Sequence, residues 1–116
     1  MKKYFLLTGI AIAALVLPNC NPSKKAAALA TPKSTYATHV STVIMNNCTP
    51  CHIPAKGGNK KAYDNFANTK SDIDEIIRRI ELNPGDKGFM PFKKAKLSDS
   101  TIAVFKKWRD DGLMEN

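Results

Sequence analysis

The chain contains 116 residues, of which 43% are hydrophobic and 24% are charged, and its formal net charge is +8. This length allows one folded domain. The lysines are dispersed and have no interleaved aromatic residues that would stack on bases, so nucleic acid is not an expected partner. A solvated basic face and a surface that steers an acidic protein partner both remain open.

The first part of the chain has the pattern of an export signal. Residues 1–3 (MKK) are a short basic start, and residues 4–17 form an almost unbroken apolar run of 14 residues. This run is shorter than the roughly 20 apolar residues that a membrane-spanning helix needs. A basic start followed by a short apolar segment is typical of a cleavable secretory leader. We therefore expect residues 1–20 to be a signal peptide and the protein to be exported.

The leader ends in the sequence LPNC, whose cysteine is Cys20. This ending resembles the lipobox of bacterial lipoproteins, in which the cysteine receives the lipid and becomes the first residue of the mature chain. Pro18 and Asn19 depart from the small residues that are usual there. Lipidation of Cys20 and simple cleavage of the leader therefore both remain open. Lipidation would anchor the protein to a membrane on the periplasmic side.

Residues 21–35 (NPSKKAAALATPKST) contain prolines, alanines and lysines, with no aromatic residue and no sustained apolar period. This composition predicts a flexible tether. Residues 36–116 then remain as the folded unit. A domain of this size often depends on a disulfide, a metal or a cofactor for stability. We therefore expect a prosthetic group.

The folded unit has the pattern of an all-α domain, and its first helix is expected over about 36–47. The apolar positions of this segment share one face, at offsets of 0, 4, 7 and 8: Tyr36, Val40, Val43 and Ile44. The helix leads directly into CTPCH, residues 48–52.

A second helix is expected to begin with Ser71 as its cap and Asp74 as the acidic partner three residues later. It should end at Asn83, because Pro84 disfavours helical geometry in the residue before it. The inward positions of this helix are Ile73, Ile76, Ile77 and Ile80.

A third helix is expected to begin at Ser98 and to end near Gly112. Its inward positions are Ile102, Phe105 and Trp108, with Val104 at the edge of the same face. No alternating pattern of useful length occurs in the chain, so the sequence predicts no β-sheet.

The CTPCH segment could serve three kinds of chemistry, and zinc is the first of them. A structural zinc site needs four ligands in a closed tetrahedral arrangement. Beyond Cys48, Cys51 and His52, the chain offers only His39 and the cysteine of the leader. This supply of ligands disfavours zinc.

Dithiol chemistry is the second possibility. A redox Cys-x-x-Cys motif normally lies at the start of a helix after a strand, where the helix dipole lowers the pKa of the first thiol. Here a predicted helix precedes the motif, while Pro54 and the pair Gly57-Gly58 follow it. The flanks therefore disfavour a thiol oxidoreductase, which stays open as an alternative together with a plain structural disulfide.

Covalent attachment of haem is the third possibility, and it uses all the special residues of the motif. The thiols of Cys48 and Cys51 can each add to one vinyl group of the porphyrin, and His52 then presents its imidazole to the iron. Export from the cytoplasm agrees with the compartment in which such attachment occurs.

A second axial ligand is needed for electron transfer, and Met90 is the main candidate. It lies in KGFMPF, where Gly88 permits a tight turn and Pro91 stiffens the backbone. Ordinary packing of Met90 beside its two phenylalanine neighbours is the alternative. The other candidates in the folded part are His39, Met45 and Met114. Met45 lies just before the motif and Met114 lies close to the chain end.

These residues resemble a class I monohaem cytochrome c over about 36–113. The resemblance rests on a helix that leads into Cys48-x-x-Cys51-His52, the later pair Met90-Pro91, and a final helix containing Trp108. It implies three main helices around one haem c per chain, with the first and last helices packed together. It further implies thioether bonds from the two cysteines, His52 as proximal ligand and Met90 as distal ligand.

Two details of the resemblance concern the residues after the motif. Ile53 stands where many members of that family have glycine, and only 37 residues separate His52 from Met90. The short spacing indicates a shortened loop between His52 and Met90 and a more exposed haem edge. The family also implies that the backbone carbonyl of Pro54 orients the His52 imidazole.

An iron with both axial positions filled does not readily bind substrate. The expected function is therefore that of a one-electron carrier and not of an enzyme: a monomer that exchanges electrons with redox protein partners. A haem-based gas-binding or sensing module with an open distal site is the alternative, followed by a thiol–disulfide oxidoreductase.

Overall fold

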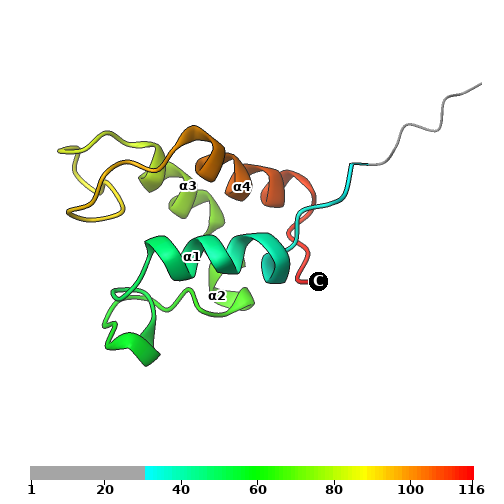
Figure 1. The fold of residues 1–116 in the computed structure, drawn as a ribbon, viewed down its shortest axis with the longest axis horizontal. Coiled ribbons are helices and arrows are strands. Elements are labelled where there is room, and N and C mark those ends of the chain that lie inside the picture. The colour runs from blue at the N-terminus through cyan, green and yellow to red at the C-terminus, as the bar shows by residue number, and fades with distance from the viewer. Residues whose placement is uncertain (1–30) are drawn as a thin grey trace, which may run out of the picture. The chain divides into compact units, whose positions relative to one another are not determined.

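A computed structural model describes residues 31–116, and these residues form a helical unit without a β-strand (Figure 1). The all-α prediction is confirmed for them. The expected leader at 1–20, the lipidation site Cys20 and the tether from 21 to 30 lie outside the described residues. In the range 31–116, no helix has the length and apolar character needed to cross a bilayer. The elements are η1 (Tyr36–Val40), α1 (Ser41–Asn47), η2 (Pro54–Lys56), α2 (Phe66–Ser71), α3 (Ile73–Glu81) and α4 (Asp99–Asp110).

The first predicted helix is present as two contiguous elements, η1 and α1. The start is a π-turn, in which the Val40 N–H donates to the carbonyl of Thr35 at 3.4 Å. The Thr35 hydroxyl accepts from the N–H of Thr38 at 3.3 Å and so caps the helix. Val40 and Ile44 are almost fully buried, which agrees with the predicted apolar face.

The beginning of the described chain is bound to its end. The Ser34 N–H donates to the carboxylate of Asp111 at 2.5 Å, so specific contacts begin two residues before the expected boundary at 36. The carbonyl of Met114 accepts from the N–H of Tyr36 at 2.9 Å and from the indole N–H of Trp108 at 2.7 Å. Although Met114 lies close to the chain end, its backbone is held from two sides.

The sequence did not predict α2, and the predicted role of Ser71 is wrong. Asn65 caps α2, because its side chain accepts from the N–H of Asn68 at 2.9 Å. Ser71 is the last residue of α2, and its hydroxyl donates to the carbonyl of Asn68 at 2.8 Å. The residue before α3 is Asp72, whose side chain makes no capping hydrogen bond.

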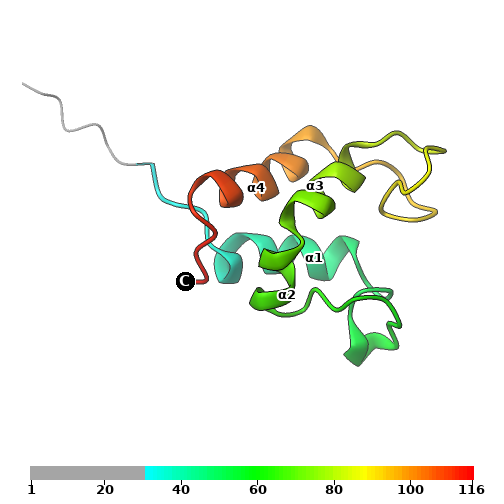
Figure 2. The ribbon, with the colours of Figure 1, turned by 180° about the vertical axis from the view of Figure 1, so that it is seen from behind.

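Helix α3 packs on α4, and α4 packs on η1 (Figure 2). All four predicted isoleucines of α3 are at most 6% exposed. Burial of one such side chain contributes about 1.5–3 kcal/mol before conformational entropy is subtracted. Trp108 is fully buried at the centre, with its ring 5.9 Å from that of Tyr36 and 6.2 Å from that of Phe66.

Helix α4 has the ends that the sequence predicts. The Ser98 hydroxyl accepts from the N–H of Thr101 at 3.2 Å at its start. At its end, Gly112 adopts a φ of 102° and its N–H donates to the carbonyl of Arg109 at 3.1 Å. The Leu113 N–H donates to the carbonyl of Trp108 at 3.0 Å, which completes a Schellman cap.

Candidate functional site

The CTPCH loop begins where α1 ends and is folded back on itself. Cys48 caps α1, and its N–H donates to the carbonyl of Ile44 at 2.8 Å. The N–H of His52 in turn donates to the carbonyl of Cys48 at 3.0 Å. Ile53, which directly follows the motif, is only 1% exposed and belongs to the apolar core. Its burial fixes the end of the loop against the helices.

The two cysteines are free thiols in different surroundings. Cys51 is exposed, whereas Cys48 is half-buried. Burial raises the pKa of the Cys48 thiol to about 11, and the positive charge of Lys94 opposes this rise only in part. A redox dithiol needs a lowered pKa at its first cysteine. The surroundings of Cys48 therefore act against thiol–disulfide exchange.

The imidazole of His52 is held through one of its two nitrogens. Nδ1 lies 2.7 Å from the carbonyl oxygen of Lys61. Because a backbone carbonyl can only accept, this contact requires the proton on Nδ1, and in the neutral ring the lone pair then lies on Nε2. The ring also stacks on Tyr63, with centroids 4.6 Å apart and planes inclined by 12°. The bare Nε2 is the atom that a metal ion would bind.

The carbonyl that orients His52 is not the one that the resemblance implies. The Pro54 carbonyl accepts instead from the N–H of Gly57 at 2.9 Å, within the short helix η2. The chain then turns back and brings the carbonyl of Lys61 to His52. The segment from Gly58 to Tyr63 thus replaces Pro54 in this role.

This returning segment is bound to the loop through the backbone. The N–H groups of Gly58, Lys60 and Tyr63 donate to the carbonyls of Ile53, Cys51 and His52 at 3.1, 3.0 and 2.9 Å. Gly58 passes so close that a Cβ atom would lie 2.3 Å from the carbonyl oxygen of Pro50. Only glycine is compatible with this close approach.

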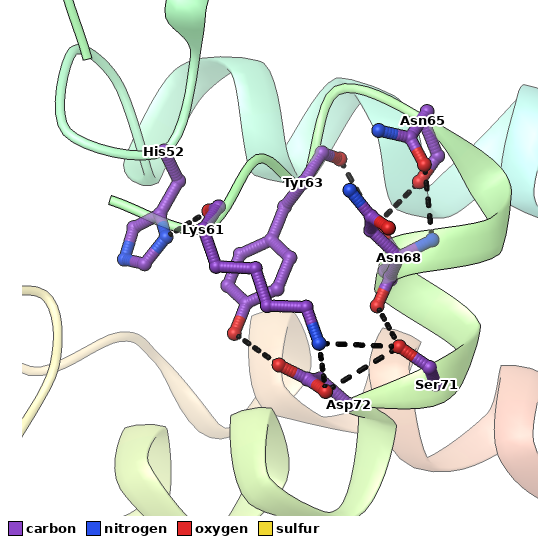
Figure 3. A network of polar contacts seen from close by, with 8 residues as sticks. His52, Lys61, Tyr63, Asn65, Asn68, Ser71 and Asp72 are labelled. Atoms are coloured by element: carbon purple, nitrogen blue, oxygen red, sulfur yellow. Dashed lines mark hydrogen bonds and ion pairs between the residues drawn. The ribbon is translucent and has the colours of Figure 1, made fainter. Parts of the chain in front are cut away.

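Side-chain contacts also hold the segment from Gly58 to Tyr63, as Figure 3 shows. The Lys61 ammonium lies 2.5 Å from the carboxylate of Asp72, and the Tyr63 hydroxyl donates to that carboxylate at 3.0 Å. The hydrogen bond from Lys61 lowers the pKa of Asp72, while burial raises the pKa of Tyr63. Asp72 is therefore ionised and Tyr63 protonated at neutral pH, as this pattern of donors requires.

Met90 lies in the long loop between α3 and α4. Its N–H donates to the carbonyl of Arg79 at 3.2 Å, which satisfies one of the free carbonyls near the end of α3. The side chain is partly buried and packs against the apolar core. Of its neighbours, Phe89 is buried and Phe92 is 65% exposed.

Lys94 connects the Met90 loop to the CTPCH loop. Its ammonium donates to the carbonyl of Thr49 at 3.1 Å and to the carbonyl of Asn47 at 3.4 Å. Both loops lie at the same end of the domain, away from the C-terminus, in both ribbon views (Figures 1 and 2). Lys96 holds the base of the same loop, because it donates to the carbonyl of Glu81 at 2.8 Å.

The other candidate ligands have different surroundings. His39 is exposed, and its Nδ1 accepts from the N–H of Thr35 at 3.2 Å. Met45 is 41% exposed on α1. Within residues 31–116, no three His, Cys, Asp or Glu side chains are placed to enclose a metal ion. The two thiols and the imidazole therefore share one loop without converging on one point.

Two hollows of about 230 and 260 Å³ lie elsewhere, one beside the ends of α3 and α4 and one between η1 and α4. Neither is lined by Cys48, Cys51, His52 or Met90.

No family model, curated protein or solved structure matches this chain. The residues that hold His52 and the Met90 loop were not predicted from the sequence: Gly58, Lys61, Tyr63, Asp72 and Lys94. The pair Gly57-Gly58 carried a partial signal, because adjacent glycines often mark a close backbone approach.

Proposed function

We propose that the chain is a one-electron carrier that holds one c-type haem through Cys48, Cys51, His52 and Met90. The observation that carries the proposal is the bare Nε2 of His52, fixed by the Lys61 carbonyl, directly after two free thiols. This donor set fits the group, because a c-type haem takes the two thiols at the porphyrin edge and needs only the imidazole from this loop at the iron. The bound haem would supply reversible one-electron exchange between the ferrous and ferric states.

The chain's own residues would hold and tune this group. The thiols of Cys48 and Cys51 would fix the porphyrin edge, and the spacing of two residues suits its two vinyl positions. Met90 would supply a thioether sulfur as the distal ligand from the neighbouring loop. A methionine sulfur favours the ferrous state and so raises the reduction potential relative to a second imidazole. With both axial positions filled, the protein would be an electron carrier and not an enzyme.

Two observations support Met90 as the distal ligand. Its loop is tied to the CTPCH loop by Lys94, at the same end of the domain. Its backbone is fixed by the hydrogen bond to Arg79, while its side chain is only partly buried and belongs to the margin of the core. If Met90 stayed away from the iron, the open site would suit a gas-binding or sensing module instead.

The proposed partners are redox proteins with an acidic docking surface. Lys93 and Lys94 are exposed on the Met90 loop, which places positive charge beside the proposed haem edge. Electrostatic attraction speeds the encounter of such partners. A monomer with a small and transient interface would suit repeated electron exchange.

The location that we propose rests on the sequence of the leader. Export would place the domain on the periplasmic side, and lipidation of Cys20 would keep it at a membrane. Replacement Cys20→Ala should move the full-length protein from the membrane fraction to the soluble fraction. An unchanged distribution would remove the lipid anchor from the proposal.

The test of the haem proposal is expression of the full chain together with haem-attachment machinery. We expect a coloured protein whose mass by mass spectrometry includes one covalently bound haem, with loss of covalent attachment in the Cys48→Ala and Cys51→Ala double variant. We also expect a low-spin reduced spectrum that carbon monoxide leaves unchanged. A colourless protein would contradict the proposal as a whole.

The distal ligand is tested separately by Met90→Ala, with Met45→Ala as the matched control. Met45 is an exposed methionine close to the motif, so its loss should leave the spectrum unchanged. Loss of Met90 should lower the reduction potential and permit binding of carbon monoxide. If the wild type already binds carbon monoxide readily, the gas-binding alternative is favoured.

A further inference from the structure

The carboxylate of Asp72 joins two residues that both touch His52 (Figure 3). Its Oδ1 lies 2.5 Å from the Lys61 ammonium, and its Oδ2 accepts from the Tyr63 hydroxyl at 3.0 Å. We call these three residues, Lys61, Tyr63 and Asp72, the Asp72 clamp. Asp72 itself makes no hydrogen bond to His52, so any effect on the imidazole must pass through Lys61 and Tyr63.

Lys61 and Tyr63 each use one group for Asp72 and a different group for His52. Lys61 binds Asp72 with its ammonium, but it accepts from His52 Nδ1 with its backbone carbonyl at 2.7 Å. Tyr63 binds Asp72 with its hydroxyl, but it meets His52 with its ring face at a centroid distance of 4.6 Å. Fixing the two side chains on Asp72 therefore restrains both the edge and the face of the imidazole.

Asp72 is itself well anchored, because it lies at the junction of α2 and α3. Its N–H donates to the carbonyl of Thr69 at 3.3 Å, and its carbonyl accepts from the N–H of Ile76 at 2.9 Å. The hydroxyl of the fully buried Thr69 also donates to the carbonyl of Tyr63 at 3.0 Å. The clamp thus connects His52 to the helical core through hydrogen bonds.

We infer that Asp72, acting through Lys61 and Tyr63, is a positioning residue that fixes the ring plane of His52 and keeps the proton on Nδ1. A hydrogen bond at the second nitrogen of a ligating histidine raises the basicity of the first. When Nε2 binds an iron, a more basic ligand favours the ferric state, so an intact clamp lowers the reduction potential. The part of this inference that concerns the potential rests on the proposed function.

The test compares variants that change the charge in opposite directions. Asp72→Asn removes a negative charge and Lys61→Met removes a positive charge, while Tyr63→Phe changes no charge and keeps the stacked ring. A simple through-space effect of charge would raise the potential in the first variant and lower it in the second. Loss of positioning should raise the midpoint potential of the haem-loaded protein in all three variants.

A control and a double variant complete the design. Lys60→Met makes the same charge change one position away, at a side chain that makes no hydrogen bond to any group within residues 31–116, and it should lower the potential slightly or leave it unchanged. The double variant Lys61→Met with Asp72→Asn should shift the potential no further than the larger single change, because both remove the same restraint. Rescue by Lys61→Arg, which retains the ion pair, separates positioning from a general loss of folding.

The outcomes are distinct from those of the haem proposal. Opposite shifts for Asp72→Asn and Lys61→Met, or no shift in either, would overturn the inference even if haem is attached. If no haem attaches, the proposed function fails, and the clamp is tested on the same purified chain by ¹⁵N NMR of the His52 ring. A loss of Nδ1 protonation in Asp72→Asn would then support the clamp, and an unchanged ring spectrum would overturn it.

Discussion

The helical side of the domain and its loop side are stabilised by different interactions. On the helical side, Trp108, Phe105 and Val40 are at most 1% exposed and pack among aliphatic and aromatic neighbours. On the loop side, the CTPCH segment is held mainly by hydrogen bonds to backbone carbonyls, by the close approach of Gly58 and by the Lys94 side chain. Apolar burial is proportional to area and has no preferred direction, whereas hydrogen bonds fix distances and angles.

This difference separates stability from positioning. The helical side should determine whether the domain folds, and the loop side should determine where His52 and Met90 lie within a folded domain. Substitutions on the helical side should therefore cause the larger losses in the free energy of unfolding. Substitutions on the loop side should be detected mainly as local changes in hydrogen exchange.

The largest effect is expected for Trp108→Ala, which would break the helical side. It removes a fully buried indole and the hydrogen bond to the Met114 carbonyl at 2.7 Å. Truncation of a buried aromatic residue typically costs about 3–5 kcal/mol, so chemical denaturation should show partial or complete unfolding. Phe92→Ala is the matched control, because Phe92 is 65% exposed. A similar loss in both variants would contradict the assignment of the core.

The next largest effect is expected for Gly58→Ala on the loop side. The added methyl would lie 2.3 Å from the Pro50 carbonyl oxygen, and the obstacle is backbone that cannot rotate away. Forced overpacking costs up to about 3 kcal/mol. Hydrogen exchange should increase at the amides of Lys60 and Tyr63, which bind the loop.

Gly57→Ala is the control for this change, because Gly57 has a φ of +82° and no atom near the position of a Cβ. It should cost only about 1 kcal/mol of conformational strain and leave the exchange at Lys60 and Tyr63 nearly unchanged. Equal effects of the two glycine variants would argue against the close approach at Gly58.

A smaller effect is expected from alkaline pH in protein prepared without attached haem. Burial raises the pKa of Cys48 to about 11 from 9.0, so the folded state retains a proton that the unfolded state loses. The contribution of Cys48 to the free energy of unfolding should therefore be fully present below pH 9 and be lost as the pH rises toward 11. The expected loss is about 1 kcal/mol between pH 8 and 10. Cys48→Ala should remove this component from denaturation curves, while Cys51→Ala, at the exposed cysteine, should retain it.

The smallest effect on stability is expected for Lys94→Met, which breaks the connection between the two loops. It removes the hydrogen bonds to the carbonyls of Thr49 and Asn47 and a positive charge at the end of α1. Such a charge at a helix end contributes about 0.3–1 kcal/mol. Denaturation should detect little change, whereas hydrogen exchange should increase in the Met90 loop. Lys93→Met, at the preceding exposed lysine, should not alter exchange in that loop.

The sequence predicted the helical side well, because apolar periodicity marks it directly. The buried positions of α3 and α4 follow from the spacing of isoleucine and aromatic residues, and α4 begins directly after Ser98 as predicted. Helix α2 was missed because its six residues, FANTKS, have no apolar period and are held by tertiary contacts around Phe66 and Thr69. The same omission explains why Ser71 was assigned to the wrong helix.

The candidate site could be predicted only in part. The motif residues Cys48, Cys51 and His52 are visible in the sequence, but the groups that orient them are mostly backbone carbonyls, which every residue carries. Nothing in the sequence distinguishes the carbonyl of Lys61 from that of Pro54 as the partner of His52. Asp72 and Lys94 likewise gain their roles only when the chain brings distant segments together.

The contacts of the chain end have a consequence for the order of folding events. Ser34 and Asp111, which are hydrogen-bonded to each other, lie 77 positions apart in the sequence. The start of the first helix and the indole of Trp108 also depend on the carbonyl of Met114. Contacts between such distant positions form late, because loop closure must precede them. During synthesis, the start of the helix that leads to Cys48 would thus lack these contacts until the segment around Met114 has been made.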